Sequence, residues 1–245
     1  IFTQDARSRD LLTGIGVKNV SVGGDTRFDR VAEIAIEQNG LPLPQAFKGD
    51  APLLVCGSTW PADERLLTEA LATFGDQAPK CIVVPHELKE AQLADIEKSF
   101  PRPLARWSEL ERSDPANVAA TLGAERHGSL LVDRMGLLAR LYQYADVAYV
   151  GGGFTDGIHN LLEAAAWGVP VIFGPKHHKF AEAQGLIDVG AGTCVNNERE
   201  LATALRTLLS DRAALEHATA EAKRYVQQRT GATKKVVDLI LPQLG

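Results

Sequence analysis

From residue 51 onward, short apolar runs alternate with amphipathic segments, and a turn follows each run. The runs at 51–58 and 80–86 lead into helix-like segments at 61–74 and 87–100, and four more apolar runs follow along the chain. Strands that alternate with helices of this length are typical of a parallel sheet with helices on both faces. We therefore expect an α/β, Rossmann-like fold with about six parallel strands.

A Pro- and Gly-rich stretch separates this pattern from the start of the chain. We expect residues 39–52 to be a linker, residues 53–245 to form the sheet domain, and residues 1–38 to be the end of another domain with a hinge. The chain opens at Ile1 inside what reads as the middle of a domain, so we also expect it to be a fragment of a longer protein. The pattern after residue 199 is helical, with a break near 230–231.

Charge and composition exclude several classes of protein. The 245 residues contain 26 Lys and Arg and 31 Asp and Glu, a net charge of −5 that argues against a general nucleic-acid-binding protein. No run approaches the roughly 18–20 apolar residues of a membrane-spanning helix. The three cysteines are scattered, with no C-x-x-C pair, which fits a reducing compartment better than a disulfide framework.

The predicted topology indicates where a ligand would bind. In an open α/β sheet, ligands bind at the carboxyl ends of the strands, against the starts of the following helices. This rule selects the loops after the predicted strands, which are residues 57–60, 85–89, 133–137, 151–160 and 174–180.

The most informative loop is 151–160, where three consecutive glycines follow a predicted strand. The glycines permit positive φ and a close approach of a ligand to the backbone, and we expect the next helix to begin near Ile158. The loop is not a G-x-G-x-x-G dinucleotide motif, because Asp156 takes the third glycine position. It is not a P-loop either, because no Lys-Ser/Thr pair follows it.

Asn160 and Glu163 lie three residues apart, so we expect both on one face of that helix. There the carboxylate can accept hydrogen bonds from a ribose diol, and the amide can donate to a phosphate. The alternative is a purely structural loop, in which the glycines make a tight turn and Glu163 is favoured near the positive helix end. The residues by themselves leave both interpretations open.

The other loops carry weaker signals. Ser58 or Thr59 can cap the next helix or bind a phosphate, and capping is the commoner role. His86 stands at a strand end, where a histidine is more often structural than functional. Core packing is the default for Met135. Residues 174–180 hold two lysines and two histidines, which favour an anion site or a solvated loop over a metal site.

Four motifs stand out in a fixed order along the chain: VGGDTRFDRV at 22–31, GLLARLYQYADVAYVGGGF at 136–154, IHNLLEAAAWGVPVIFGP at 158–175 and KFAEA at 179–183. On these residues the chain resembles the bacterial 3-deoxy-D-manno-octulosonate (Kdo) transferases. The resemblance implies a GT-B fold, in which two Rossmann-like domains enclose the active site. It also implies that 53–245 is the C-terminal domain, which binds the donor CMP-Kdo, and that 1–38 ends the N-terminal acceptor domain.

For the site, the resemblance implies contacts between CMP-Kdo and residues of four loops: Ser58, Thr59, His86, Met135, Gly136, Gly152, Gly153, Asn160 and Glu163. Glu163 would bind the ribose, Asn160 and the loop amides the phosphate, and Met135-Gly136 would lie beside the cytosine. The family's catalytic base is a glutamate of the N-terminal domain, so no catalytic residue is expected in this chain. Neither a metal nor another cofactor is expected, because helix ends and side chains stabilise the departing CMP phosphate.

The implied activity is transfer of Kdo from CMP-Kdo to a lipid A precursor in lipopolysaccharide synthesis. The implied location is the cytoplasmic face of the bacterial inner membrane, with peripheral membrane association of the full-length protein and a soluble fragment here. The implied partners are CMP-Kdo and, through the other domain, the lipid A precursor, and no nucleic acid.

The chain departs from the family pattern in two respects, the glycine motifs and an arginine. Gly151-Gly152-Gly153 stands where the family often has Gly-Gly-Ser, and Gly157-Ile158 stands where it often has two glycines before His-Asn. An arginine often found after the second strand is also missing, so His86 or Lys89 would take its place. Two alternatives stay open: another GT-B enzyme that uses a UDP-sugar, such as a UDP-N-acetylglucosamine epimerase or transferase, and a non-catalytic nucleotide-binding module.

Overall fold

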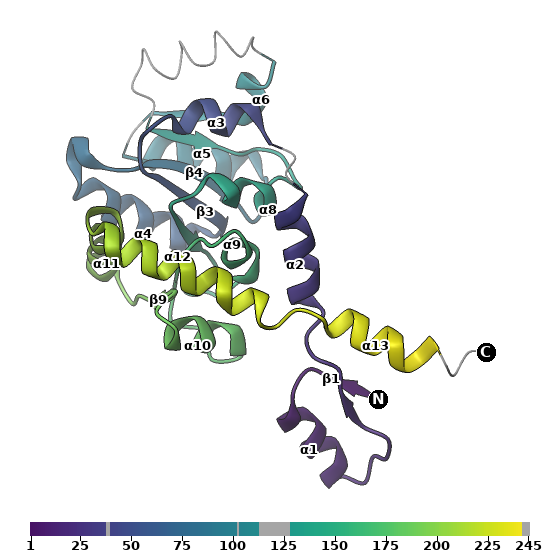
Figure 1. The fold of residues 1–245 in the computed structure, drawn as a ribbon. Helices are drawn as coiled ribbons and strands as arrows, with labels where there is room; N and C mark the ends of the chain where they lie inside the picture. Colours follow the sequence, from purple (N-terminus) through teal and green to yellow (C-terminus); the bar gives the residue numbers. More distant parts are fainter. Residues whose placement is uncertain (38–39, 102, 113–127, 242–245) are drawn as a thin grey trace.

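A seven-stranded parallel sheet forms the centre of the computed structural model, which describes residues 1–37, 40–101, 103–112 and 128–241 (Figure 1). The strand order is β5-β6-β4-β3-β7-β8-β9, and every neighbouring pair is parallel. The strands are β3 (Leu53–Thr59), β4 (Lys80–Pro85), β5 (Leu104–Arg106), β6 (Ser129–Leu131), β7 (Val147–Val150), β8 (Val171–Phe173) and β9 (Gly192–Cys194). The predicted parallel sheet is confirmed.

The expected count of about six strands is too low, because β5 was missed. This strand has three half-buried residues and lies at the edge of the sheet, beside β6. Its sequence, Leu-Ala-Arg, contains no apolar run that a sequence pattern can detect.

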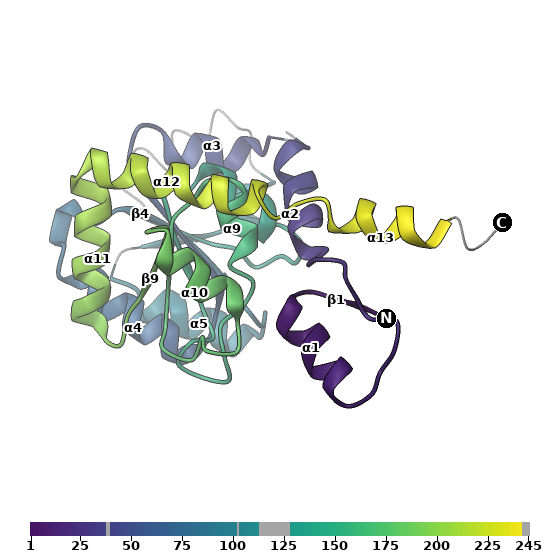
Figure 2. The same cartoon turned by 60° about the horizontal axis from the view of Figure 1, so that its bottom comes forward.

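Helices cover both faces of the sheet, as Figures 1 and 2 show. Along β3, Leu53 and Val55 face one buried cluster and Leu54 and Cys56 face the other, because successive strand residues point to opposite faces. The first face is covered by α2 (Arg27–Ile36), α3 (Pro42–Lys48), α6 (Trp107–Leu110), α8 (Leu138–Leu141), α9 (Leu162–Ala166), α10 (Ala181–Asp188) and α12 (Arg212–Gln227). The second is covered by α4 (Pro61–Ala72), α5 (Glu90–Ser99) and α11 (Glu198–Ser210).

The order of the strands reverses between β3 and β7, and we call the region at the carboxyl ends of these two strands the crevice. The chain runs outward from β3 to β4 and β6, and then returns to place β7 on the other side of β3. Consequently α4, which follows β3, packs on one face of the sheet, whereas α9, which follows β7, packs on the other. The connections after β3 and β7 therefore lead to opposite faces of the sheet, and a sheet of this kind binds ligands at such a point.

The first residues form a small unit beside the sheet. Strands β1 (Phe2–Thr3) and β2 (Ser21–Val22) pair in parallel, with α1 (Ala6–Gly14) between them in the chain. Figures 1 and 2 show this unit set apart from the sheet and next to α13 (Ala232–Ile240).

The segment expected as a linker contains a packed helix. Within 39–52, α3 buries Pro44 and the whole Phe47 side chain against the sheet. The apolar residues of this segment therefore belong to the core, although its Pro and Gly content suggested a connection. The division of the chain into an acceptor part, a linker and a donor part stays a prediction.

Helix α2 joins the start of the chain to its end. Arg27 forms ion pairs with Asp25 (2.8 Å) and with the buried Glu182 of α10 (2.7 Å). Two residues after Arg27, Asp29 accepts hydrogen bonds from the backbone amides of Gly231 (2.5 Å) and Thr233 (2.7 Å) at the start of α13. The C-terminal helices α12 and α13 thus pack against α2, within residues 1–38.

The C-terminal helices break where the sequence indicates. Gly231 has a φ of 100°, which favours glycine, and α13 starts directly after it. A second break at Asp211 separates α11 from α12, and the Asp211 side chain caps α12. Earlier in the chain, α8 has four residues and passes directly into a 3₁₀ turn, Tyr142–Tyr144.

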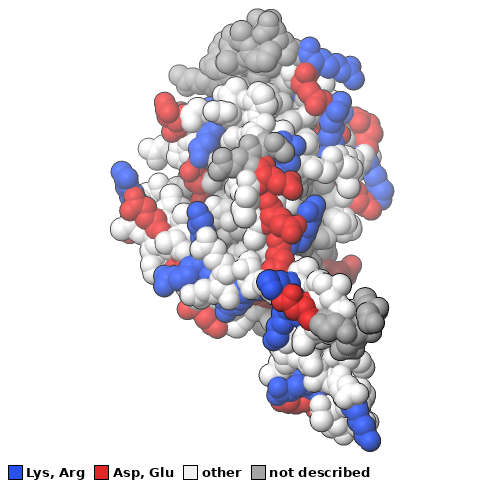
Figure 3. Space-filling model, turned by 45° about the vertical axis from the view of Figure 1, so that its right-hand side comes forward, with Lys and Arg blue, Asp and Glu red and all other residues white. Residues whose placement is uncertain are grey.

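Two surface properties bear on partners. In the part of the chain that the structure describes, no helix is long and apolar enough to span a bilayer. On the face drawn in Figure 3, acidic and basic side chains are interspersed.

Candidate functional site

The carboxyl ends of β3, β4 and β7 lie side by side in the sheet and bring three of the predicted loops together. Strand β3 pairs with β4 through Thr59 and Pro85, and with β7 through Gly57 and Val150. The expected placement of the loops at 57–60, 85–89 and 151–160 at one edge of the sheet is therefore confirmed. The loop at 133–137 follows β6, the next strand beyond β4.

The three glycines after β7 fit closely against the protein's own backbone. A Cβ on Gly151 would lie 2.3 Å from the Ser58 carbonyl oxygen, and one on Gly153 would lie 2.5 Å from the Gly174 Cα. Gly152 has a φ of 92°, and its Cβ would lie 2.3 Å from the Gly157 carbonyl oxygen. The glycines are thus required by internal packing. The expectation that they let a ligand approach has no support from this geometry.

The helix expected from Ile158 begins later, at Leu162. Before the helix, Ile158 donates to the Lys176 carbonyl (3.3 Å) and His159 donates to the Gly151 carbonyl (3.1 Å). The prediction of the helix start was wrong: residues 158–160 belong to the loop, and the Asn160 side chain accepts the Leu162 amide at the start of the helix.

Asn160 and Glu163 lie together although Asn160 precedes the helix. The Asn160 amide donates to Glu163 Oε1 (3.1 Å), and its side-chain oxygen accepts from the amide of Leu162 (3.1 Å). Burial raises the pKa of Glu163, and the hydrogen bond from Asn160 acts in the opposite direction. The pair therefore offers a half-buried carboxylate oriented by an amide, an arrangement that can accept hydrogen bonds from a diol.

A buried carboxylate beneath the loops ties two of them together. Asp63, in the first turn of α4, accepts hydrogen bonds from the amide of Trp60 (3.0 Å), the amide of Gly152 (2.9 Å) and the hydroxyl of Tyr149 (2.7 Å). Its side chain is fully buried. Hydrogen bonds to a charged acceptor are stronger than those between neutral groups, so Asp63 holds the loops after β3 and β7 in a fixed relation.

Three aromatic rings gather above this carboxylate, one from each strand end. The ring centroids of Trp60 and His86 are 4.7 Å apart, and those of His86 and His159 are 4.4 Å apart. The Trp60 indole donates to His159 Nε2 (3.0 Å). Burial lowers the pKa of His159, as does the neighbouring imidazole of His86, whereas Asp63 acts in the opposite direction.

The last two residues of β3, Ser58 and Thr59, differ in conformation and burial. Ser58 adopts a φ of 52°, unusual for a residue other than glycine, where the register of β3 against β4 shifts. Thr59 is fully buried, and its hydroxyl donates to the carboxylate of Glu64 (3.1 Å). Neither caps α4: Trp60 is the N-cap residue, and Asp63 reaches back to its amide. The expected capping role was wrong, because a capping box formed one residue later.

Met135 and Gly136 lie where a ligand can reach them. Met135 is 77% exposed, so the default expectation of core packing was wrong. Gly136 has a φ of 84° in the turn after β6. A large apolar side chain left in solvent beside a candidate site can cover a bound base.

The two candidates to replace an arginine after β4 are placed differently. His86 packs against Trp60 and His159 at the site, whereas Lys89 is 71% exposed and pairs with Glu87 (2.6 Å). His86 is therefore the one that the fold brings to the crevice.

The loop at 174–180 packs against the glycine loop. The amide of Lys176 donates to the Gly153 carbonyl (2.9 Å), its ammonium group donates to the Thr155 carbonyl, and His177 is buried with its ring edge against Phe173. This part of the loop is integrated into the fold, while His178 and Lys179 are exposed. Among the described residues, no group of three or more His, Cys, Asp or Glu side chains is arranged to hold a metal ion.

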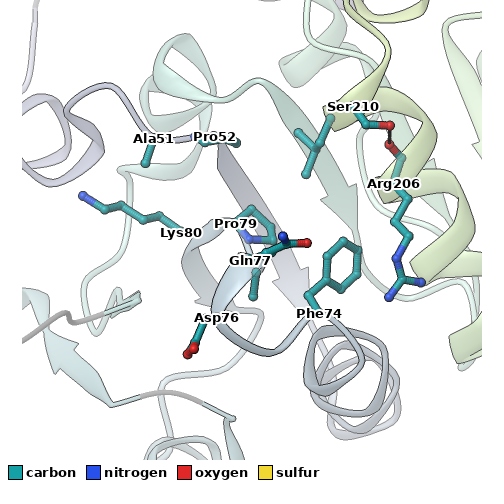
Figure 4. A pocket seen from close by; sticks show the side chains of 11 residues that line it. Ala51, Pro52, Phe74, Asp76, Gln77, Pro79, Lys80, Arg206 and Ser210 are labelled. Atoms are coloured by element: carbon teal, nitrogen blue, oxygen red, sulfur yellow. Dashed lines mark hydrogen bonds between the residues drawn. The ribbon is translucent and has the colours of Figure 1, made fainter.

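A cavity of about 570 Å³ lies at the opposite, amino ends of β3 and β4 (Figure 4). Its two cationic groups already have partners: Lys80 donates to the Phe47 carbonyl (2.6 Å), and Arg206 donates to the Thr73 carbonyl (2.9 Å) and lies over the Phe74 ring. Because the topology directs ligands to the carboxyl ends, the crevice between β3 and β7 is the candidate site.

The sequence did not predict three residues of the site: Trp60, Asp63 and His159. Asp63 had a usable signal, since an acidic residue three positions after the N-cap is typical of a capping box. Trp60 and His159 had none, because 99 residues separate two side chains that touch only in the folded chain.

Comparison with known proteins identifies relatives of this chain. No protein-family model matches it. A 3-deoxy-D-manno-octulosonic acid transferase of Aquifex aeolicus is 49% identical over 83 residues, which are 33% of this chain and 24% of that protein. The transferase of the same name from Rickettsia prowazekii is 24% identical over 241 residues, which are 97% of this chain and 50% of that protein. The chain thus spans about half the length of that relative, and less of the first.

Solved structures agree on the fold. The C-terminal CMP-Kdo binding domain of WaaA from Acinetobacter baumannii is 23% identical with a TM-score of 0.62, over 81% of this chain and 99% of that domain. A UDP-N-acetylglucosamine 2-epimerase is 13% identical with a TM-score of 0.60, over 99% of this chain and 57% of that protein. At these identities the two structures show only that the chain shares their fold. The likeness to the epimerase therefore does not favour the epimerase alternative. The chain is therefore similar in sequence to 3-deoxy-D-manno-octulosonic acid transferases, and it has the Rossmann-like fold of a GT-B glycosyltransferase domain.

Proposed function

We propose that this chain is the donor-binding part of a Kdo transferase, which transfers Kdo from CMP-Kdo to a lipid A precursor in lipopolysaccharide synthesis. The observation that carries the proposal is the similarity to curated Kdo transferases, which reaches 97% of the chain in one of them. The crevice between β3 and β7 supports it, because its position suits a nucleotide-sugar.

In this proposal the Asn160–Glu163 pair binds the nucleoside. The Glu163 carboxylate accepts hydrogen bonds from the ribose hydroxyls, and the Asn160 amide orients it through the 3.1 Å hydrogen bond. Met135 covers the cytosine from the solvent side, since its side chain is 77% exposed at the neighbouring loop. His86 and Ser58 lie at the two strand ends that face the phosphate.

The chemistry proposed for the donor needs no metal ion or other cofactor. Hydrogen-bond donors placed around the departing CMP phosphate stabilise the charge that develops there. The base that activates the acceptor is proposed to lie outside these residues, in the acceptor domain. The transfer reaction is proposed to occur at the cytoplasmic face of the inner membrane, where a lipid acceptor and a nucleotide donor meet.

Calorimetric titration tests the proposal. The purified chain is titrated with CMP, UMP and UDP under the same conditions, and we expect CMP to bind more tightly than the two uridine nucleotides. Preference for UMP or UDP would favour an enzyme that uses a UDP-sugar. Absence of binding to all three would contradict a donor-binding role.

A transfer assay addresses the position of the base. The chain is given CMP-Kdo and a lipid A precursor, with a full-length curated relative as the positive control. We expect no turnover by the chain, because holding the acceptor and the base against the donor can contribute about 7–11 kcal/mol. Turnover near the rate of the control would place the base within these residues.

A further inference from the structure

The rings of Trp60, His86 and His159 form a cluster at the mouth of the crevice, and the proposed function assigns no role to two of them. Trp60 follows β3, His86 follows β4, and His159 lies in the loop after β7. His86 stacks on both neighbours, at 4.7 Å from Trp60 and 4.4 Å from His159, while the planes of Trp60 and His159 are 11° apart. The three strand ends thus hold one another through aromatic contacts.

The hydrogen bond within this cluster has only one direction. The indole Nε1 of Trp60 can donate but cannot accept, so Nε2 of His159 accepts over the 3.0 Å between them. A nitrogen that accepts carries no proton. His159 is therefore the neutral imidazole with its proton on Nδ1. Burial lowers the pKa of His159, which also favours the neutral form.

The neighbours of the His159 ring determine which of its two nitrogens is available to a ligand. His159 Cδ2, which is bonded to Nε2, faces Gly152, where an added Cβ would lie 3.0 Å away. Trp60 and Gly152 thus occupy the Nε2 edge. Among the described residues, no hydrogen bond engages Nδ1, and His159 is half-buried directly before Asn160.

We propose that Trp60 is a positioning residue that holds His159 in the Nδ1–H tautomer, so that the imidazole donates a hydrogen bond to the phosphate of a bound nucleotide. This inference rests on the proposed nucleotide site and adds a phosphate donor to it. A fixed neutral donor serves an anion well, because it needs no proton uptake before binding and its orientation is set before the ligand arrives.

The tautomer is measured directly by ¹⁵N NMR on the chain with ¹⁵N-labelled histidine. The nitrogen shifts distinguish a protonated Nδ1 from a protonated Nε2, and His159→Gln identifies the His159 signals by their loss. We expect a protonated Nδ1 in the unsubstituted chain. We expect Trp60→Phe, which keeps a ring but removes the indole N–H, to shift His159 toward the Nε2–H form. Trp167→Phe is the matched control, since its indole donates to the Ala139 carbonyl (2.7 Å) away from the cluster, and it should change nothing at His159.

Titrations with CMP and cytidine test the phosphate contact. Trp60→Phe should weaken CMP binding about 3- to 10-fold, the size of one hydrogen bond, and leave cytidine binding as it is. Equal loss for both ligands would show that Trp60 supports the nucleoside instead, and would overturn the proposal. So would a protonated Nε2 in the unsubstituted chain.

Two further outcomes are separable. Failure of the unsubstituted chain to bind CMP contradicts the proposed function itself, whatever the tautomer. Normal CMP binding with an unchanged tautomer in Trp60→Phe contradicts this inference alone. If Trp60→Phe does not fold, the spectrum of the unsubstituted chain decides the tautomer, and His159→Gln tests the selective loss of CMP over cytidine binding.

Discussion

The carboxylate of Asp63 accepts a hydrogen bond from the backbone amide of Gly152, with 2.9 Å between Oδ2 and N, although 89 residues separate the two along the chain. This contact joins the first turn of α4 to the loop after β7, on opposite sides of the crevice. The other oxygen accepts from the Tyr149 hydroxyl at 2.7 Å. One buried side chain thereby fixes the spacing of the two loops that frame the candidate site.

The first prediction concerns this carboxylate. Asp63→Asn places an amide N–H₂ group among three hydrogen-bond donors and should lower the free energy of unfolding by about 2–3 kcal/mol, since a buried polar group without a partner is costly. Urea denaturation measures the change. Asp76→Asn, an exposed position after α4, is the control and should stay within about 0.5 kcal/mol. Equal stability of both variants would mean that Asp63 does not tie the loops together.

The second prediction concerns nucleotide binding. Glu163→Ala should weaken CMP binding by about 1.5–3 kcal/mol, because the variant loses a hydrogen bond to a charged acceptor. Calorimetry on the chain measures this, and circular dichroism checks that the fold is intact. Glu216→Ala, which removes a 65% exposed carboxylate from α12, is the control and should bind CMP normally. Unchanged affinity of a folded Glu163→Ala variant would refute the ribose role.

The third prediction concerns pH. Burial raises the pKa of Glu64 above 4.5, and hydrogen bonds from Gln92 and Thr59 offset only part of the rise. The folded chain therefore binds the proton more tightly than the unfolded chain. Through Glu64, the free energy of unfolding should fall as pH rises from about 4.5 through the raised folded-state pKa.

Glu64→Gln tests that sign. The glutamine can still accept from Gln92 and Thr59 but has no proton to lose, so the pH profile of stability should be flatter above pH 4.5. Denaturant unfolding at a series of pH values gives the profile. The exposed Glu69→Gln on the same helix should keep the slope of the unsubstituted chain. A profile of Glu64→Gln that stays as steep would contradict the assignment.

The fourth prediction concerns α13. Asp29→Ala removes the acceptor for the amides of Gly231 and Thr233 and should cost about 1 kcal/mol, as for other lost helix caps. Hydrogen exchange of the amides in 232–240 should become faster, because α13 loses its attachment to α2. Asp238→Ala, which breaks only an exposed pair with Lys234, should leave that exchange much closer to normal. Equal exchange in both variants would show that α13 docks without the cap.

Much of the fold and part of the site follow from the sequence by itself. The apolar runs predict the parallel sheet, since each short run must be buried between helices, and the break at Gly231 follows from its backbone freedom. The spacing of Asn160 and Glu163 predicts that they meet, and they do, at 3.1 Å. These features depend on residues that are near one another in the chain.

The rest was decided only by tertiary structure. The short strand β5 exists because β6 offers an edge, and α3 is a helix packed on the core where composition indicated a linker. The helix after the glycines begins only at Leu162, after a loop that is held by hydrogen bonds to distant carbonyls. Trp60 and His159 are 99 residues apart in the chain, and their hydrogen bond forms only because the folded sheet places the ends of β3, β4 and β7 side by side. Periodicity reports which face of an element is buried, but contacts between loops depend on the order of the strands in the sheet, which no local pattern encodes.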